Sequence, residues 1–469
     1  MREQGHEQHR RPEAASDGSV GAVWRLRCSQ QRRGAEVAND CKDAGGVNQH
    51  QERTASENTG SLYKPRCPHD RTPLIVATVL FTWELGGGIG HLVRHRGLIQ
   101  QLLTDGHRVH FHACDLEKAL QVFDGLALEL ARAPRGYTPP EDQIAQSNSY
   151  PEVIWNSGFS DAAAVQQRLQ HWRSVVAQLK PDVVIADYSP SVVVACKLSG
   201  TRVVAIGSGF YTPPPISPLP AYHYWLANDR ARLAASEARL LEVINSAATA
   251  LADRPFSSVA EALVVAETFL LLFAELDPVF DRPDTEFMGV WPVPGFGIPP
   301  VWPGTGPRVF AYLEPSVLLP DILAASAALG LSLCLYAPGL RADALPAIPG
   351  LNVHLAAEPV DLVQAAAECE MAITNGNPNS LAGFLLAGKP QLAVPYTMEK
   401  YLIARRLELL GAGLSAPMRR PGDLAAKLRA VLVQRNFRRE AESFAARYAG
   451  GSEAALVQRM RERLALRTF

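Results

Sequence analysis

Residues 73–92 read PLIVATVLFTWELGGGIGHL, and this stretch decides the fold class. The run from Ile75 to Thr82 is almost entirely apolar, which is typical of a strand buried on both faces of a parallel sheet. A run of glycines follows, and a helical pattern begins near His91. A buried strand, a glycine turn and a helix begin a βαβ unit, so the stretch indicates a doubly wound α/β domain.

Strands alternate with helices along the rest of the chain. Further strand-like runs lie at 107–113, 126–133, 182–188 and 202–208, and an apolar run at 262–273 reads as the end of a helix followed by a buried strand. A segment dense in Pro and Gly at 277–306 interrupts the alternation, which resumes with strand-like runs at 308–313, 331–337, 351–356, 370–374 and 389–395. We therefore expect two Rossmann-like doubly wound domains facing across a cleft, at 73–276 and 307–420, with a linker at 277–306 and C-terminal helices at 421–469.

The first 72 residues differ from the rest. They are rich in Arg, Gln, Glu, Gly and Asn, and their apolar residues are scattered without period. Such a segment buries too little apolar surface to offset the entropy of ordering it. We expect a disordered extension at 1–72, or a stretch that an upstream start codon adds, and we find no apolar run of signal-peptide type in it.

Composition excludes several classes of protein. A length of 469 residues with 47% hydrophobic residues suits two globular domains, and a net charge of -1 gives no overall attraction to nucleic acid or to an anionic membrane. The seven cysteines are far apart and form no CxxC pair, which argues against a disulfide framework and a zinc knuckle. The cysteine pattern also indicates a reducing compartment, so we expect a cytoplasmic protein. We expect no transmembrane segment, because the most apolar run is too short to span a bilayer.

Two polar residues follow strands that should be neighbours. His91 comes after the first strand, and Asp187 ends the fourth strand of the N-terminal domain. In a doubly wound sheet these strands flank the point where strand order reverses, so both side chains should meet in one crevice. At the start of a helix the dipole disfavours an imidazolium, which suits His91 to take a proton from an alcohol. Asp187 would fix the tautomer of the ring and stabilise the charge it gains.

Two other interpretations of this segment fit less well. The glycine run resembles a dinucleotide fingerprint, but His91 or Val93 occupies the position of the third glycine. His91 and His95 are four residues apart, as in a metal site, but Leu92 follows His91, so HExxH is absent, and no third ligand is evident. We therefore predict no metal site.

The second informative stretch, residues 373–413, reads ITNGNPNSLAGFLLAGKPQLAVPYTMEKYLIARRLELLGAG. A strand ends at Thr374, Asn377 can cap the next helix, and Pro378 suits its first turn. The free N–H groups at such a helix start bind anions. On spacing alone, an ordinary α/β repeat with a capped helix explains the stretch equally well.

This stretch resembles the donor-binding signature of the UDP-glycosyltransferase superfamily, which includes plant flavonoid and bacterial macrolide glycosyltransferases. The positions of the signature correspond to Asn375, Gly376, Asn377, Ser380, Gly383, Gly388, Pro390, Pro395, Glu399 and Lys400. The segment GIGHL resembles the catalytic-histidine segment of the family, and Asp187 falls at the position of its partner aspartate. The likeness is collinear from about Leu74 to the C-terminus.

The resemblance implies a GT-B fold and an inverting transfer, without metal or cofactor, of a hexose-type sugar from a nucleotide diphosphate to a hydroxyl. His91 would be the base and Asp187 its partner. The resemblance also implies a donor site made of the segment around Val360, the helix start from Asn375, Gly376 and Asn377 to Ser380, and Glu399 with Lys400. The partners would be a nucleotide sugar and a small acceptor.

Four departures from the family signature concern the donor. Asn375 replaces the histidine that meets the diphosphate, Gly383 replaces the glutamate that binds the ribose, and Lys400 replaces a glutamine. The loop after Tyr312 also lacks the usual glycine. A UDP-sugar and a dTDP-sugar therefore remain equally plausible donors, and Lys400 is either a cation of the cleft or a solvated surface lysine.

The acceptor side is the aromatic and apolar stretch GFYTPPPISPLPAYHYW at 209–225, which suits a lipophilic acceptor. A second hypothesis is a catalytically degenerate GT-B protein that serves as an auxiliary partner of another enzyme. The retained His91 and Asp187 favour an enzyme, and the altered donor signature favours the auxiliary role.

Overall fold

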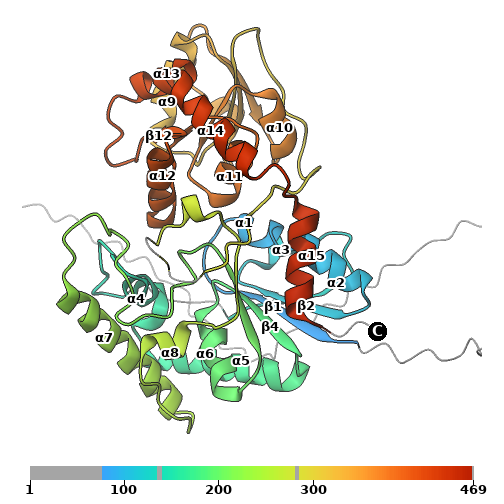
Figure 1. Cartoon of the computed structure of the whole chain (residues 1–469), viewed down its shortest axis with the longest axis vertical. Coiled ribbons are helices and arrows are strands. Elements are labelled where there is room, and N and C mark those ends of the chain that lie inside the picture. The colour runs from blue at the N-terminus through green and yellow to red at the C-terminus, as the bar shows by residue number, and fades with distance from the viewer. Residues whose placement is uncertain (1–75, 135–139, 280–281, 283–284, 467–469) are drawn as a thin grey trace, which may run out of the picture.

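The computed structural model describes residues 76–134, 140–279, 282 and 285–466, and the extension expected at 1–72 lies outside these ranges. Two parallel sheets of six strands, each covered by helices, form two domains (Figure 1). This confirms the α/β fold with two doubly wound domains that the alternation predicts.

The N-terminal sheet has the strand order β3-β2-β1-β4-β5-β6. Its strands are β1 Thr78–Trp83, β2 Arg108–Ala113, β3 Glu129–Arg132, β4 Val183–Asp187, β5 Val203–Gly207 and β6 Thr268–Leu270. Strand order reverses between β1 and β4, which pair in parallel with Trp83 opposite Asp187. β1 is buried along its whole length, as its apolar sequence predicts.

The helices of this domain pack on both faces of the sheet. They are α1 Gly90–Val93, α2 Arg96–Thr104, α3 Leu116–Val122, α4 Tyr150–Ile154, a π-helical turn Trp155–Phe159, α5 Ala162–Leu179, α6 Pro190–Ser199, α7 Arg230–Thr249, α8 Val259–Leu263 and a 3-10 turn Ala274–Leu276. One apolar core contains the α2 side of the sheet, with Phe81 and Phe111, and another contains the α5 and α6 side, with Leu80 and Trp172.

The C-terminal sheet is also a parallel sheet of six strands, with the strand order β12-β11-β10-β7-β8-β9. Its strands are β7 Arg308–Tyr312, β8 Ser332–Tyr336, β9 Asn352–Ala356, β10 Met371–Thr374, β11 Gln391–Ala393 and β12 Gly413–Ser415, and its helices are α9 Leu319–Ala328, a 3-10 turn Ala342–Ala344, α10 Leu362–Glu368, α11 Pro378–Leu386 and α12 Met398–Leu410. β12 is absent from the strands expected from the sequence, because three residues of small and mixed character carry no periodic signal.

The C-terminal helices are α13 Leu424–Val433, α14 Arg435–Arg447 and α15 Glu453–Leu464. α15 leaves the second domain and lies beside α2 of the first (Figure 1). The contact is close, since a Cβ on Gly97 would lie 1.8 Å from a carboxylate oxygen of Glu453. Arg461 of α15 donates to Asp105 at the end of α2. The linker and α15 therefore both connect the two domains.

No helix in the described ranges is both long enough and apolar enough to cross a bilayer. Within those ranges, no disulfide involves Cys114, Cys196, Cys334 or Cys369.

Candidate active site

His91 and Asp187 meet at the carboxyl edge of the N-terminal sheet, as the strand order predicts. His91 is the second residue of α1, and Asp187 is the last residue of β4. The Nδ1 atom of His91 lies 2.9 Å from Oδ1 of Asp187. A carboxylate only accepts hydrogen bonds, so the ring carries its proton on Nδ1 and leaves the lone pair of Nε2 free. Because α1 has only four residues, Asp187 orients the ring more than a helix dipole does.

Asp187 also binds a second histidine, which sequence reasoning considered only as a metal ligand. Nε2 of His95 lies 3.0 Å from Oδ2 of Asp187, and Nε of Arg94 lies 3.7 Å from the same oxygen. Burial by itself would raise the pKa of Asp187, but the charge of Arg94 and the bonds to His91 and His95 hold it well below its ordinary value. Asp187 is therefore an ionised, fully buried carboxylate that can stabilise a proton on His91.

Gly86 keeps space open beside the basic nitrogen of His91. A Cβ at this position would lie 2.8 Å from Nε2 of His91, and the backbone has φ +91°. Only glycine adopts this conformation readily and leaves that space to another molecule. A hydroxyl that enters here can reach the free lone pair of the ring.

Aromatic rings surround His91. Trp83 stacks on it at 5.5 Å between ring centroids, and Tyr211 lies at 5.4 Å. Tyr211 in turn stacks on Tyr188 at 3.9 Å. Tyr188 has φ +43°, a conformation that a tyrosine keeps only where its surroundings enforce it and that is frequent at functional sites. The rings form an apolar wall next to the base.

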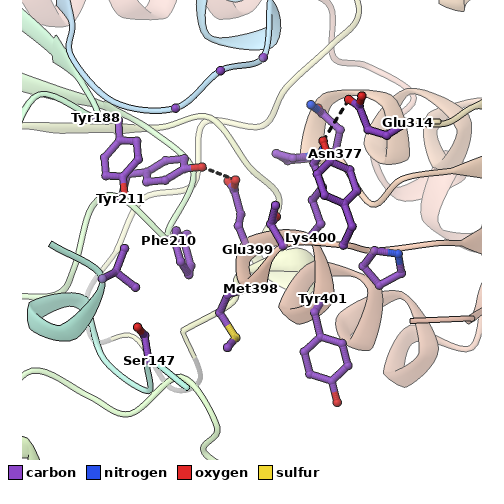
Figure 2. A pocket seen from close by; sticks show the side chains of 18 of the residues that line it. Ser147, Tyr188, Phe210, Tyr211, Glu314, Asn377, Met398, Glu399, Lys400 and Tyr401 are labelled. Atoms are coloured by element: carbon purple, nitrogen blue, oxygen red, sulfur yellow. Dashed lines mark hydrogen bonds between the residues drawn. The ribbon is translucent and has the colours of Figure 1, made fainter. Parts of the chain in front are cut away.

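A cleft of about 1320 Å³ separates His91 from the start of α11 in the other domain. His91, Tyr188 and Phe210 line the N-terminal side, and Asn377, Glu399 and Lys400 line the C-terminal side. Figure 2 shows the side chains of Tyr188, Phe210 and Tyr211 opposite those of Glu399 and Lys400. The two constellations predicted from sequence therefore face one cleft.

The start of α11 matches the predicted capped helix. Asn377 is the N-cap and accepts from the N–H of Asn379, and Pro378 is the first helical residue. Oδ1 of Asn375 accepts from the N–H of Asn377. Within the described part of the chain, the buried Nδ2 of Asn375 has no hydrogen-bond partner. A buried polar donor of this kind is expected to bind something that the protein alone does not supply.

Glu399 was expected to bind hydroxyls of a donor sugar. In the structure it lies at the contact between the two domains. Its carboxylate accepts a hydrogen bond from the hydroxyl of Ser208 at 2.6 Å and another from the hydroxyl of Tyr211 (Figure 2). Two carboxylate oxygens offer about four acceptor positions, so further donors fit. Glu399 thus joins α12 to the loop after β5 while still lining the cleft.

Lys400 is a half-buried residue of the cleft and not a solvated surface lysine. Its Nζ donates to the hydroxyl of Tyr396 at 2.5 Å and lies 3.8 Å from the centre of that ring. The hydroxyl of Tyr396 donates to Glu314 at 3.0 Å. Burial lowers the pKa of Lys400 to about 8, although Glu314 and Glu399 act in the opposite direction.

The other donor-site residues are less accessible. Val360 is buried and forms a β-bridge with Ile298 of the linker, so it offers a ligand chiefly its backbone. Ser380 is buried in the first turn of α11. Gly376 has φ +81°, and a Cβ there would lie 2.8 Å from the carbonyl oxygen of Lys400. A Cβ on Gly383 would lie 3.5 Å from the ring of Pro292 in the linker.

Sequence reasoning did not identify Arg94, the bond from His95 to Asp187, or Tyr211 as parts of the site. The spacing of His91, Arg94 and His95 is typical of one helix face, but the sequence does not show that Arg94 and His95, between α1 and α2, both reach Asp187. Among the described residues, no grouping of three or more His, Cys, Asp or Glu side chains is suited to a metal ion. The expectation of a metal-independent reaction stays a prediction.

No protein-family model matches the sequence, and no curated protein matches it either. Solved structures do match. The spinosyn rhamnosyltransferase SpnG is 18% identical with a TM-score of 0.57, over 82% of this chain and 100% of its own. The glycosyltransferase VinC in complex with dTDP is also 18% identical, with a TM-score of 0.59 over 82% of this chain and 99% of its own. The chain has the GT-B fold.

A third similar structure is the glycosyltransferase SnogD from Streptomyces nogalater, which is 16% identical with a TM-score of 0.54, over 83% of this chain and 99% of its own. These GT-B proteins are matched over almost their whole length. The GT-B likeness therefore covers both domains and the cleft between them.

Proposed function

We propose that this GT-B protein is a glycosyltransferase that moves a hexose-type sugar from a nucleoside diphosphate to a hydroxyl of a small lipophilic acceptor. The observation that carries the proposal is the His91–Asp187 pair at 2.9 Å, which faces the N-terminus of α11 across the cleft. The pair supplies a base, and the helix start supplies an anion site. Transfer of a group from a diphosphate to an alcohol needs both.

In the proposed reaction, the acceptor hydroxyl enters the space beside Gly86, within reach of Nε2 of His91. Its oxygen attacks the anomeric carbon, its proton passes to Nε2, and the bond from the anomeric carbon to the diphosphate breaks with both electrons leaving on the diphosphate. Asp187 stabilises the imidazolium that forms. Because the acceptor attacks from the side opposite the leaving group, the anomeric centre inverts. The proposed step uses no metal ion.

On the donor side, the unpartnered amide of Asn375 and the helix start near Gly376, Asn377 and Ser380 would hold the diphosphate. Glu399 would accept from sugar hydroxyls through its remaining acceptor positions. Lys400 would add a cation to the cleft when it is protonated. The segment around Val360 would meet the base through its backbone.

The proposed choice of nucleotide rests on Gly383. At this position the family signature has a glutamate that binds the ribose. A site that bonds a hydroxyl discriminates against ligands without it, because its polar group is then left unpaired. Gly383 has no carboxylate to leave unpaired, so UDP-sugars and dTDP-sugars should be accepted alike. Two similar proteins, VinC and SpnG, were solved with dTDP and thymidine diphosphate, which supports including a dTDP-sugar among the proposed donors.

The acceptor would lie along the aromatic wall. Tyr188 and Tyr211 stack at 3.9 Å, Phe210 lies edge-on to Tyr211 at 5.2 Å, and Met398 lines the same cleft from the other domain (Figure 2). Such a surface favours an apolar, flat part of an acceptor. One related structure is SpnG in complex with spinosyn aglycone, which has a TM-score of 0.57 to this chain.

Thermal unfolding of the full chain with and without nucleoside diphosphates tests the proposal. A ligand that binds the folded state at about 100 times its Kd stabilises it by about 2.7 kcal/mol. We expect UDP and dTDP to raise the melting temperature and their affinities to agree within about tenfold, or about 1.4 kcal/mol. A larger preference for UDP would mean that a residue other than the one at position 383 recognises the ribose.

A catalytically degenerate auxiliary protein is the second candidate. Glu314, whose carboxylate lies in the cleft beside Tyr396, favours it, because a negative charge in a diphosphate site weakens binding. In that case neither nucleotide would change the melting temperature. The His91–Asp187 pair and the open space beside Nε2 favour the enzyme.

A further inference from the structure

Arg94 is an almost fully enclosed cation whose two terminal amino groups donate no hydrogen bond within the described part of the chain. Its side chain is 4% exposed, and Nε donates to the carbonyl oxygen of Gly90 at 2.9 Å. The 3.7 Å from Nε to Asp187 exceeds hydrogen-bond distance. A buried guanidinium is costly unless its N–H groups are bonded. Its open amino groups therefore suit an anion that enters from outside.

Arg94 belongs to the acceptor-side domain but lies next to the start of α11. A Cβ on Gly90, whose carbonyl binds Arg94, would lie 3.5 Å from Nδ2 of Asn377 and 3.7 Å from Nδ2 of Asn379. Arg94 lines the main cleft together with Asn377, and it lines an adjoining cavity of about 70 Å³ together with Asn379. The guanidinium and the helix start thus border the same space from two domains.

The start of α11 has few free donors of its own for an anion, so a nearby cation would strengthen the site. Its side chains occupy two of its own N–H groups, since Asn375 binds the N–H of Asn377 and Asn377 binds that of Asn379. Pro378 has no N–H. Within the described ranges, this leaves the N–H of Ser380 and neutral amide groups, including the unpartnered Nδ2 of Asn375. These are weaker partners for a diphosphate than a guanidinium is.

We propose that Arg94 binds the terminal phosphate of the donor diphosphate across the domain interface and stabilises it as it leaves. This inference rests on the proposed function. When the bond from the anomeric carbon to the phosphate oxygen breaks, that oxygen keeps the electron pair, and the planar guanidinium meets the new charge with two N–H donors. His91 takes the acceptor proton at the same time. Arg94 is then a catalytic residue, and it couples donor binding to the His91–Asp187 pair, because it also lies beside Asp187.

The test compares nucleoside diphosphate with nucleoside monophosphate binding by calorimetry, using dTDP with dTMP and UDP with UMP. Arg94→Gln should weaken diphosphate binding at least about tenfold, as the loss of charged hydrogen bonds predicts, and monophosphate binding less than about threefold. Arg96→Gln is the matched control, because Arg96 is a neighbouring arginine that donates to the carbonyl oxygen of Val122 and lines neither the cleft nor the adjoining cavity. It should leave both affinities unchanged.

Arg94→Lys keeps the positive charge but lacks the planar guanidinium, so its diphosphate affinity should lie between those of the wild type and Arg94→Gln. This graded result would also show that the loss in Arg94→Gln is not caused by misfolding. Equal diphosphate affinity in Arg94→Gln and the wild type would overturn the inference. So would an equal loss of diphosphate and monophosphate binding, because Arg94 would then act on the fold of the site. If the wild type binds no nucleotide, the proposed function itself fails.

Discussion

Asp187→Asn removes the charge that stabilises the imidazolium while keeping the size of the side chain. The carboxylate lies 2.9 Å from His91, 3.0 Å from His95 and next to the guanidinium of Arg94, and it is fully buried. Two unit charges about 4 Å apart attract by about 4 kcal/mol at an effective dielectric constant of about 20. Losing this attraction in the transition state slows the reaction about a thousandfold.

Two further effects of Asp187→Asn should also slow the reaction. His91 and His95 bond different oxygens of Asp187, and an amide has an NH₂ group in place of one of them, so one of the two bonds is lost. The charge of Arg94 also loses its carboxylate neighbour, which further disfavours a proton on His91. Breaking a buried charge pair costs about 3–5 kcal/mol of folding stability, so the melting temperature should fall as well.

The assay is steady-state turnover with the most active donor and acceptor pair. We expect kcat of Asp187→Asn to fall at least a hundredfold, with little change in the KM for the donor. Asp182→Asn is the control. Asp182 lies just before the same strand, and its carboxylate binds the N–H of Thr78 at 2.7 Å at the opposite edge of the sheet. It should lose stability but not kcat. Asp187→Asn that keeps more than a tenth of the wild-type kcat would refute the reasoning.

Three other variants test the geometry of the cleft. Gly86→Ala places a methyl group 2.8 Å from Nε2 of His91, so it should reduce kcat at least about tenfold without changing nucleotide affinity. Gly106→Ala is the control, because Gly106 has a similar φ of +85° but open space around it. It should change neither kcat nor nucleotide affinity. Gly376→Ala combines φ +81° with a contact of 2.8 Å to the carbonyl of Lys400, and it should weaken nucleoside diphosphate binding, again by comparison with Gly106→Ala. Lys400 has a pKa of about 8, so it is a cation below that pH and neutral above it. The affinity for nucleoside diphosphates should therefore fall between pH 7 and pH 9. Lys400→Arg should abolish this pH dependence, because Arg stays protonated. Wild-type affinity that is flat over this pH range would remove Lys400 from the site.

The parts of the site that sequence predicts are those fixed by long elements. β1 and β4 are continuous apolar strands, and the handedness and order of a doubly wound sheet then bring His91 and Asp187 together. The cap of α11 is likewise local, since Asn377 and Pro378 specify it within one turn. Such features depend on a few neighbouring residues and on rules of topology.

The parts that sequence does not predict depend on how the two domains meet. Glu399 binds Ser208 and Tyr211, which are about 190 residues away, because the linker and α15 set the orientation of the domains. No pattern in the sequence encodes that orientation. The role of Arg94 also depends on it, since its open amino groups matter only when α11 of the other domain lies beside it.

The central claim is that His91 is the base of a glycosyl transfer. Its most direct test is turnover of His91→Ala, measured as product formed from a nucleotide sugar and an acceptor, alongside diphosphate binding by the same variant. A general base contributes about a hundredfold or more to the rate, so we expect turnover to fall by at least that factor. Nucleoside diphosphate affinity should stay within about threefold of the wild type, because α11 lies in the other domain. Wild-type turnover in His91→Ala would contradict the account.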